Sequence, residues 1–200
     1  MRICVVFLFL LFFPALLCAR EPEELVVATF NRDTPTNEVG GNYGAWNYNT
    51  SDPSQRCYSD LELDDPFDPE EGYSVRLDYD VLSDKPAFNG FWMKLEGIDL
   101  TRYDTLSFWV KGDEEIGFTQ RFKLELKNIF GEKTTYIVWG IESDWKEITL
   151  AIKDGVKLID WSSMAELVIV FDDILATKKE GSILIDQFVF RRGLPGLSRR

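Results

Sequence analysis

Two tryptophans carry the clearest chemical signal in the sequence. Apolar and polar residues alternate from Phe91 to Leu95 and from Leu106 to Lys111, and Trp92 and Trp109 fall on the polar side. A tryptophan on the solvent side of a strand is unusual unless something covers it. An exposed indole ring offers a flat surface to the C–H face of a sugar, and charged neighbours can bond its hydroxyl groups. The pattern therefore predicts either a carbohydrate-binding face or tryptophans that are covered by loops.

Charged residues in similar segments supply polar groups for such a face. Like the two tryptophans, these charged residues alternate with apolar residues along their segments. Trp139 lies in the segment that follows residues 121–127 across a predicted hairpin turn. Consecutive strands of a sandwich can belong to different sheets, so the alternation does not place all of them on one face. The candidates for ligand contact on this pattern are Lys94, Arg76, Lys123, Glu125 and Trp139.

The composition of the chain excludes several other kinds of chemistry. The sequence has 22 Lys and Arg, 34 Asp and Glu and no histidine, which gives a net charge of −12 at pH 7. Nucleic acids and anionic membrane surfaces bind clustered cations, so neither is an expected partner. Histidine-based catalysis and histidine-bearing zinc sites are excluded as well. A glycosidase would need two positioned carboxylates, and no motif singles out such a pair.

Residues 1–19 have the layout of a cleaved secretory signal. A short basic start precedes an apolar run from Ile3 to Leu17, which is shorter than the ~20 residues of a membrane span. Cleavage after Ala19 would leave a chain without a membrane span. We therefore expect an exported protein, secreted into the periplasm or the extracellular space, with a lipid anchor at Cys18 as the alternative.

The rest of the chain has the length of one domain. Residues 20–190 form the expected domain, and the basic segment 191–200 is expected to be a flexible tail. After signal cleavage only Cys57 remains, so the domain has no intramolecular disulfide and depends on packing for its stability.

Short segments with period-two alternation recur about every ten residues, separated by clusters of Gly, Pro, Asn and Asp. They predict an all-β fold, a β-sandwich with about nine antiparallel strands in two sheets. The apolar run ELVIVF, residues 166–171, predicts a central strand covered on both faces. Residues 39–49, VGGNYGAWNYN, lack alternation, and we expect a loop there. The predicted strands are 25–30, 73–81, 91–95, 106–111, 121–127, 136–141, 145–152, 166–171 and 182–190.

Four stretches of the chain resemble a known superfamily. They are ATFNRDTPTNEVGGNYGAWN from Ala28 to Asn47, NGFWMKLEGIDLTRYDTLSFWVKGD from Asn89 to Asp113, SDWKEITLAI from Ser143 to Ile152, and GSILIDQFVF from Gly181 to Phe190. They are similar to the galactose-binding-like jelly rolls, which include many carbohydrate-binding modules and the domains related to complex I intermediate-associated protein 30. The resemblance implies the fold; it leaves function open, because the scaffold hosts sugar binding, protein contacts and purely structural roles.

The resemblance gives the glycine-rich segment two interpretations. In the similar modules, the loop after the first strand wraps toward the rim of the binding face. Tyr43, Trp46 and Tyr48 would then either cap the end of the sandwich or stack on a sugar ring, and Gly40, Gly41 and Gly44 would permit the turns.

The resemblance also implies a structural calcium ion. In such modules it lies between the first strand and an aspartate of the closing strand, which corresponds to Asp186. Asn31 or Asp33 would be its partner near the first strand. Since Ca²⁺ takes six to eight oxygen ligands, backbone carbonyls or water must complete the site.

These observations predict an exported, non-catalytic protein that resembles carbohydrate-binding modules and binds a glycan or polysaccharide. One alternative is an envelope or assembly protein that uses the sandwich face to contact another envelope or secreted protein. A further alternative is a jelly-roll glycoside hydrolase or polysaccharide lyase.

Overall fold

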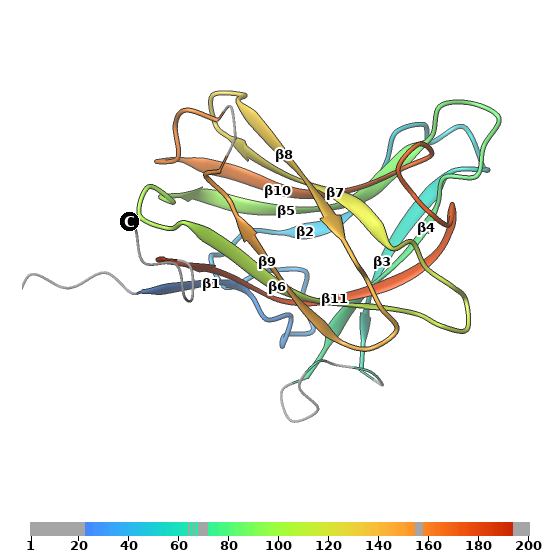
Figure 1. The fold of residues 1–200 in the computed structure, drawn as a ribbon, viewed down its shortest axis with the longest axis horizontal. Coiled ribbons are helices and arrows are strands. Elements are labelled where there is room, and N and C mark those ends of the chain that lie inside the picture. Colours follow the sequence, from blue (N-terminus) through green and yellow to red (C-terminus); the bar gives the residue numbers. More distant parts are fainter. Residues whose placement is uncertain (1–22, 64, 66, 68–71, 155–157, 194–200) are drawn as a thin grey trace, which may run out of the picture.

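The computed structural model describes residues 23–63, 65, 67, 72–154 and 158–193, which form a sandwich of two antiparallel sheets (Figure 1). The predicted all-β jelly roll is confirmed. Within the described residues, no helix is long and apolar enough to cross a membrane. The eleven strands are β1 (Glu24–Ala28), β2 (Tyr43–Asn47), β3 (Arg56–Glu62), β4 (Ser74–Asp80), β5 (Phe88–Ile98), β6 (Thr105–Gly112), β7 (Arg121–Asn128), β8 (Lys133–Trp139), β9 (Lys146–Ala151), β10 (Met164–Asp172) and β11 (Glu180–Arg191).

The two sheets have different strand orders. The six-stranded sheet runs β3-β4-β11-β6-β9, with β1 also pairing with β11, and the five-stranded sheet runs β2-β5-β10-β7-β8. Some strands that follow each other in the sequence therefore lie in different sheets, as β5 and β6 do. Outward residues of neighbouring segments can thus face opposite sides of the molecule.

Large aromatic rings fill the space between the sheets. Phe108 and Phe188 stack with ring centroids 4.9 Å apart, and Tyr79 stacks on Phe171 at 4.2 Å. These four rings are almost fully buried. Complete burial of one such side chain stabilises the fold by about 2–3 kcal/mol, so this domain does not need a disulfide to form a stable core.

Strand β10 is the central strand that its apolar sequence predicts. It pairs with β5 on one side and β7 on the other. Leu167 and Ile169 point into the core, while Val168 and Val170 point to the outer face of the five-stranded sheet, where they are nevertheless buried. Neighbouring side chains on the outer face must therefore cover them.

Two strands differ from the prediction. The expected loop over residues 39–49 contains β2, and residues 56–62, where no strand is predicted, form β3, so the described residues have eleven strands in place of nine. In β2 the outward positions are Gly44 and Trp46, which hides the alternation of polar and apolar residues. In β3 the only fully buried hydrophobic residue is Cys57, which is a free thiol.

The ends of the chain are described only in part. The predicted signal segment, residues 1–19, and residues 194–200 lie outside the described residues. The closing strand extends one residue beyond the predicted domain, to Arg191. The Arg191 side chain forms ion pairs with Glu24 and Glu147, at 2.8 and 3.0 Å, so it joins three strands of the six-stranded sheet.

Asp172 closes β10 with a buried carboxylate. Its Oδ1 accepts hydrogen bonds from the backbone N–H groups of Ile174 and Leu175, at 3.0 and 2.8 Å, and its Oδ2 lies 2.6 Å from Nζ of Lys123. Burial alone would raise the pKa of Asp172. The hydrogen bonds from Lys123 and from the two amides outweigh burial and hold the pKa below its ordinary value.

We expect Asp172→Asn to lower the free energy of unfolding at pH 7 by about 1–3 kcal/mol, because it removes the buried charged acceptor that pairs with Lys123 and the two amides. A lowered native pKa stabilises the fold above the unfolded-state value near 4 and ceases to do so as the pH falls. Urea unfolding at pH 7 and pH 3 measures this effect. The difference in the free energy of unfolding between the variant and wild type should be smaller at pH 3 than at pH 7. Asp173→Asn is the control; an equal effect of both substitutions would contradict the assignment.

Candidate functional site

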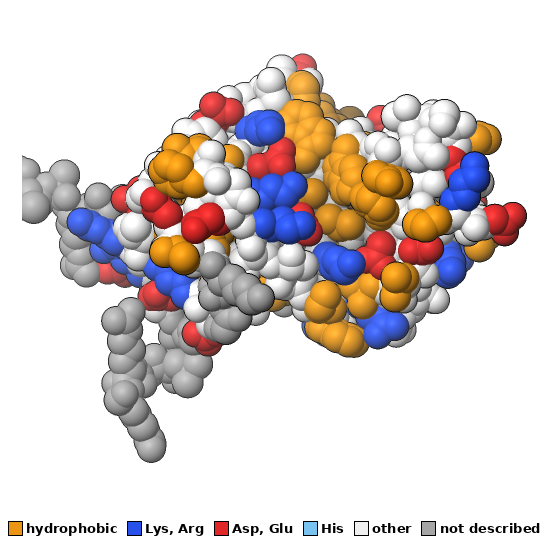
Figure 2. Space-filling model, turned by 90° about the horizontal axis from the view of Figure 1, so that it is seen from above, with side chains coloured by type: hydrophobic (Ala, Val, Ile, Leu, Met, Phe, Trp, Pro, Cys, Tyr) orange, Lys and Arg blue, Asp and Glu red, His pale blue; other side chains and the backbone are white. Residues whose placement is uncertain are grey.

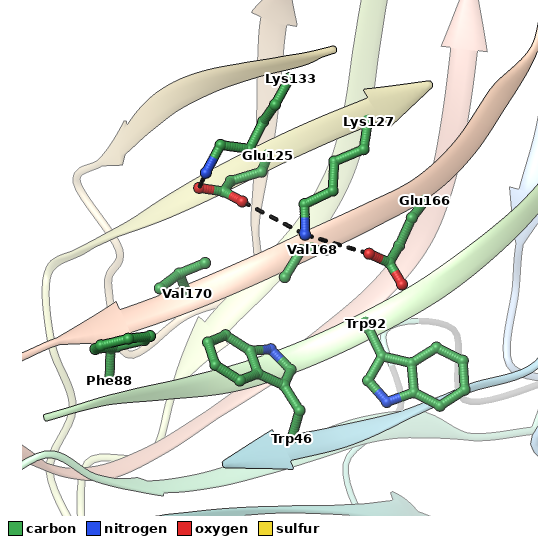
Figure 3. Close-up of a pocket in the computed structure, with 9 residues that line it drawn as sticks. All are labelled: Trp46, Phe88, Trp92, Glu125, Lys127, Lys133, Glu166, Val168 and Val170. Carbon is green, nitrogen blue, oxygen red and sulfur yellow. Dashed lines mark hydrogen bonds and ion pairs between the residues drawn. The ribbon is translucent and has the colours of Figure 1, made fainter. Parts of the chain in front are cut away.

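The outer face of the five-stranded sheet holds a pocket of about 410 Å³. Figure 2, which views the molecule from this side, shows hydrophobic side chains gathered next to lysine, arginine and acidic groups. All five strands of the sheet or their ends contribute. The lining residues, drawn in Figure 3, are Trp46, Phe88, Trp92, Glu125, Lys127, Lys133, Glu166, Val168 and Val170.

Two tryptophans form the aromatic side of the pocket. The antiparallel pairing of β2 with β5 places Trp92 opposite Gly44 and Trp46 opposite Gly90. A Cβ atom on Gly44 would lie 3.6 Å from the Trp92 ring, and one on Gly90 would lie 3.3 Å from Nε1 of Trp46. Each indole therefore lies beside a glycine of the neighbouring strand, where no side chain lifts it away from the sheet.

Two valines form the apolar floor. Val168 is opposite Trp92 in the pairing of β10 with β5, and Val170 is opposite Gly90. Both lie between the tryptophans and the charged residues of the pocket in Figure 3. The pocket therefore has an apolar base, with an aromatic side and a charged side.

Five charged side chains form a chain of ion pairs across the strands, which we call the charge ladder. Lys133 pairs with Glu125 at 2.8 Å, and Glu125 lies 3.7 Å from Lys127. Lys127 pairs with Glu166 at 3.2 Å, and Glu166 pairs with Lys94 at 2.8 Å. The alternating signs give a row of hydrogen-bond donors and acceptors beside the valine floor (Figure 3).

The charge ladder touches the aromatic side of the pocket at one end. Nζ of Lys94 lies 5.5 Å from the centroid of the Trp92 ring, within the range of a cation–π interaction. Glu125 in the middle of the ladder is only 8% exposed. Because its lysine partners and neighbouring strands fix it, its carboxylate presents oxygen atoms in a defined position.

Four of the predicted ligand residues meet at this site. The structure brings Trp92, Trp46, Lys94 and Glu125 together on one face. Lys123 lies next to the pocket on the same face, opposite Val170, and forms its ion pair with Asp172.

Trp139 lies on the edge strand β8 of the same sheet. It is exposed and has the Arg121 guanidinium 5.3 Å from its ring centroid. It does not line the pocket.

Trp109 and Arg76 belong to the opposite face of the molecule, which corrects their prediction as partners of Trp92. Trp109 stacks on Phe67 with centroids 3.9 Å apart, and Trp145 meets the edge of the same phenylalanine ring. Arg76 forms ion pairs with Glu62 at 3.0 Å and Asp113 at 2.6 Å. The alternative of a covered tryptophan therefore describes Trp109.

The prediction that Tyr43 contacts a ligand is also wrong. Tyr43 is buried and points into the core, where it packs against Phe30 and Phe91 with centroids 5.1 and 5.7 Å away. Its hydroxyl donates a hydrogen bond to the carbonyl of Thr34, and burial raises its pKa to about 12. Of the two interpretations of the glycine-rich segment, capping applies to Tyr43, while Trp46 lines the pocket.

Sequence reasoning missed several lining residues. Alternation marks Lys133 and Glu166 as outward-facing, since each lies two residues before another outward residue of its strand. Without the register of β10 and β8, however, nothing in the sequence assigns them to the same face as Trp92. Phe88 lies at the start of β5, outside the predicted strand.

The predicted calcium ligands do not form a cluster of acidic side chains. Asp186 is buried beside a bulge in β11, and its Oδ1 accepts a hydrogen bond from the amide of Gln187 at 2.7 Å. Asn31 and Asp33 are exposed. Among the residues that the structure describes, no three acidic or cysteine side chains form a group that could hold a metal ion. Side chains alone therefore do not complete this site, and calcium binding stays a prediction.

Solved structures with the same fold include carbohydrate-binding modules. The family 11 module of the cellulosomal cellulase Lic26A-Cel5E of Clostridium thermocellum is 14% identical, with a TM-score of 0.63 over 88% of this chain and 98% of that chain. A family 11 module of the same organism in complex with a β-1,3-1,4-mixed-linked tetrasaccharide is also 14% identical, with a TM-score of 0.61 over 86% and 96%. This chain shares their fold.

A third similar structure is the CBM22-1 xylan-binding domain of Xyn10C from Paenibacillus barcinonensis. It is 14% identical, with a TM-score of 0.50 over 84% of this chain and 92% of that chain. Other matching structures contain the fold as part of an agarase or a xylanase, of which this chain covers 25% and 30%. No protein-family model matches the sequence, and no curated protein matches it.

We expect Gly90→Ala to destabilise the protein far more than Gly44→Ala. The new Cβ of Gly90→Ala would lie 1.9 Å from the carbonyl oxygen of Ile169, so β5 and β10 would have to separate, whereas Gly44→Ala adds an ordinary contact with Trp92. Forced overpacking of this kind typically costs about 1–3 kcal/mol. Urea unfolding of both variants measures the difference, and equal stabilities would contradict the described pairing of β5 with β10.

Proposed function

We propose that this protein is a non-catalytic glycan-binding module whose site is the outer face of the five-stranded sheet. Trp46 and Trp92 would stack on sugar rings, and the charge ladder would bond the hydroxyl groups. The observation that carries the proposal is the placement of two indoles beside glycines, next to a row of fixed donors and acceptors. Apolar rings beside converging polar groups are what a sugar requires, because it has apolar C–H faces and polar edges.

The fold of the similar structures supports this proposal. Two of them are described as a module in complex with a mixed-linked tetrasaccharide and as a xylan-binding domain. At 14% sequence identity, the likeness supports a shared fold and nothing more specific. Which glycan is bound is therefore left to experiment.

The arrangement of the two pocket carboxylates favours binding over hydrolysis. A glycosidase places two carboxyl groups on either side of the scissile bond, one as acid and the other as nucleophile or base. Here Lys127 lies between Glu125 and Glu166 and pairs with both (Figure 3). A sugar bond cannot occupy the position that this ammonium group fills.

Export is also part of the proposal, and it rests on the sequence of residues 1–19. A module that binds polysaccharides has its ligands outside the cytoplasm, so the two parts of the proposal agree.

We expect Trp92→Ala to lower the affinity for glycans by at least about tenfold, the equivalent of 1.4 kcal/mol, because it removes half of the aromatic side. Trp109→Ala is the matched control on the opposite sheet, where Phe67 covers the ring. It should keep the affinity of wild type in spite of a lower thermal stability. Binding to a glycan array, followed by titration with each glycan found, measures both effects.

Two results would contradict this assignment of the site. Loss of binding in Trp109→Ala with binding retained in Trp92→Ala would move the site to the six-stranded sheet. A folded wild-type protein that binds no glycan, with or without calcium, would favour contact with another protein instead.

The predicted calcium ion would be bound by the buried Asp186 carboxylate together with backbone oxygens near Asn31. A ligand at a hundred times its dissociation constant stabilises the native state by about 2.7 kcal/mol. Added Ca²⁺ should therefore raise the Tm of wild type and leave the Tm of Asp186→Asn unchanged. If both proteins respond equally to Ca²⁺ and to a chelator, Asp186 is not a ligand.

A further inference from the structure

The aromatic side of the pocket continues beyond the pocket. Tyr48 follows the last residue of β2, and its backbone N–H donates a hydrogen bond to the carbonyl of Phe88 at 3.2 Å, which extends the pairing of β2 with β5. The Tyr48 ring stacks on the Phe88 ring with centroids 3.9 Å apart and an interplanar angle of 25°. Tyr48 is nevertheless 59% exposed, so one side of its ring is supported and the other is open.

Phe88 connects this stack to the pocket. It lines the pocket, and its ring centroid lies 6.0 Å from that of Trp46. The rings of Trp46, Phe88 and Tyr48 therefore follow one another along β2 and β5, and Trp92 lines the same pocket as Trp46. From Gly44, which faces Trp92, to Tyr48 the strand advances about 13 Å, at roughly 3.3 Å per residue. That length exceeds a single sugar ring.

The polar side continues in the same direction. Lys123 is opposite Val170, and Asp172 is opposite Phe88 in the pairing of the strands. Their ion pair at 2.6 Å therefore follows the charge ladder along β10, away from Glu166. Both sides of the pocket extend past its end, as a ligand that extends along the strands would require.

A second exposed tyrosine shows that exposure alone does not produce this arrangement. Tyr58 on β3 is 54% exposed, and its ring has the Arg56 guanidinium 5.9 Å from the centroid in place of a stacked aromatic ring. Single exposed apolar residues are normal on protein surfaces. The ring contacts that join Tyr48 through Phe88 to Trp46 distinguish Tyr48 from Tyr58.

Resting on the proposed function, we propose that the ligand is an extended glycan chain that runs parallel to β2 and β5. Its sugars occupy the pocket between Trp92 and the charge ladder and then pass over Phe88 to stack on Tyr48. Tyr48 is thus a separate binding position that only a chain longer than the pocket reaches. A single sugar or a short end group would use the pocket alone.

The test is calorimetric titration with β-1,3-1,4-linked gluco-oligosaccharides and β-1,4-linked xylo-oligosaccharides of two to six units. For the series that binds, Tyr48→Ala should lose about three- to tenfold in affinity for the longest members and nothing for the shortest member that binds. Tyr48→Phe, which keeps the ring, should behave as wild type. Tyr58→Ala is the matched control for loss of an exposed tyrosine and should have no effect at any length.

The outcomes separate this inference from the proposed function. If Trp92→Ala abolishes binding while Tyr48→Ala has no effect, or lowers affinity equally at every length, the site stands and the extended track is wrong. If wild type binds neither series, the inference is overturned, and the glycan array decides the proposed function. Thermal unfolding of Tyr48→Ala confirms that the variant is folded, as expected for an exposed side chain.

Discussion

The register between β2 and β5 is the constraint on which the site depends. It places each outward tryptophan opposite a glycine, Trp92 with Gly44 and Trp46 with Gly90. Because side chains alternate across a strand, a shift of β2 by one residue would turn Trp46 into the core and bring Tyr43 to the surface. The burial of Tyr43 against Phe30 and Phe91 holds the register, so core packing and the geometry of the site are set by the same contact.

The two outer faces of the sandwich use the same residue type in opposite ways. On the six-stranded sheet, Phe67 covers Trp109 and Trp145 meets the edge of that phenylalanine ring. On the five-stranded sheet, Trp46 and Trp92 line a pocket that also contains the charge ladder. Covering the tryptophan on the six-stranded sheet limits the exposed apolar area that favours aggregation.

The sequence predicts the fold better than the site. Alternation identifies β4, β5, β6 and β7, because a half-buried strand alternates apolar and polar residues. The apolar run identifies β10, because a strand covered on both faces is apolar at successive positions. Strand β2 shows neither pattern, since its outward residues are glycine and tryptophan. Alternation leaves open which candidates share the face of Trp92. Trp109 and Arg76 do not, because β6 and β4 belong to the other sheet from β5, which only long-range contacts decide.

The pocket residues show the same limit. Lys94 and Glu125 are predictable as outward residues of their strands. That Lys127 would lie between Glu125 and Glu166 depends on the pairing of β7 with β10, a contact between residues about forty positions apart. Local patterns therefore supply the residue types of the site, and tertiary pairing supplies their geometry.

The indole N–H signals of the six tryptophans in a two-dimensional NMR titration test the central claim most directly. Addition of a glycan that binds, or of the mixed-linked tetrasaccharide as first probe, should shift the signals of Trp46 and Trp92. The signals of Trp109, Trp145 and Trp161 should not move. Shifts confined to Trp109 and Trp145 would contradict the account, because they would place the ligand on the opposite sheet.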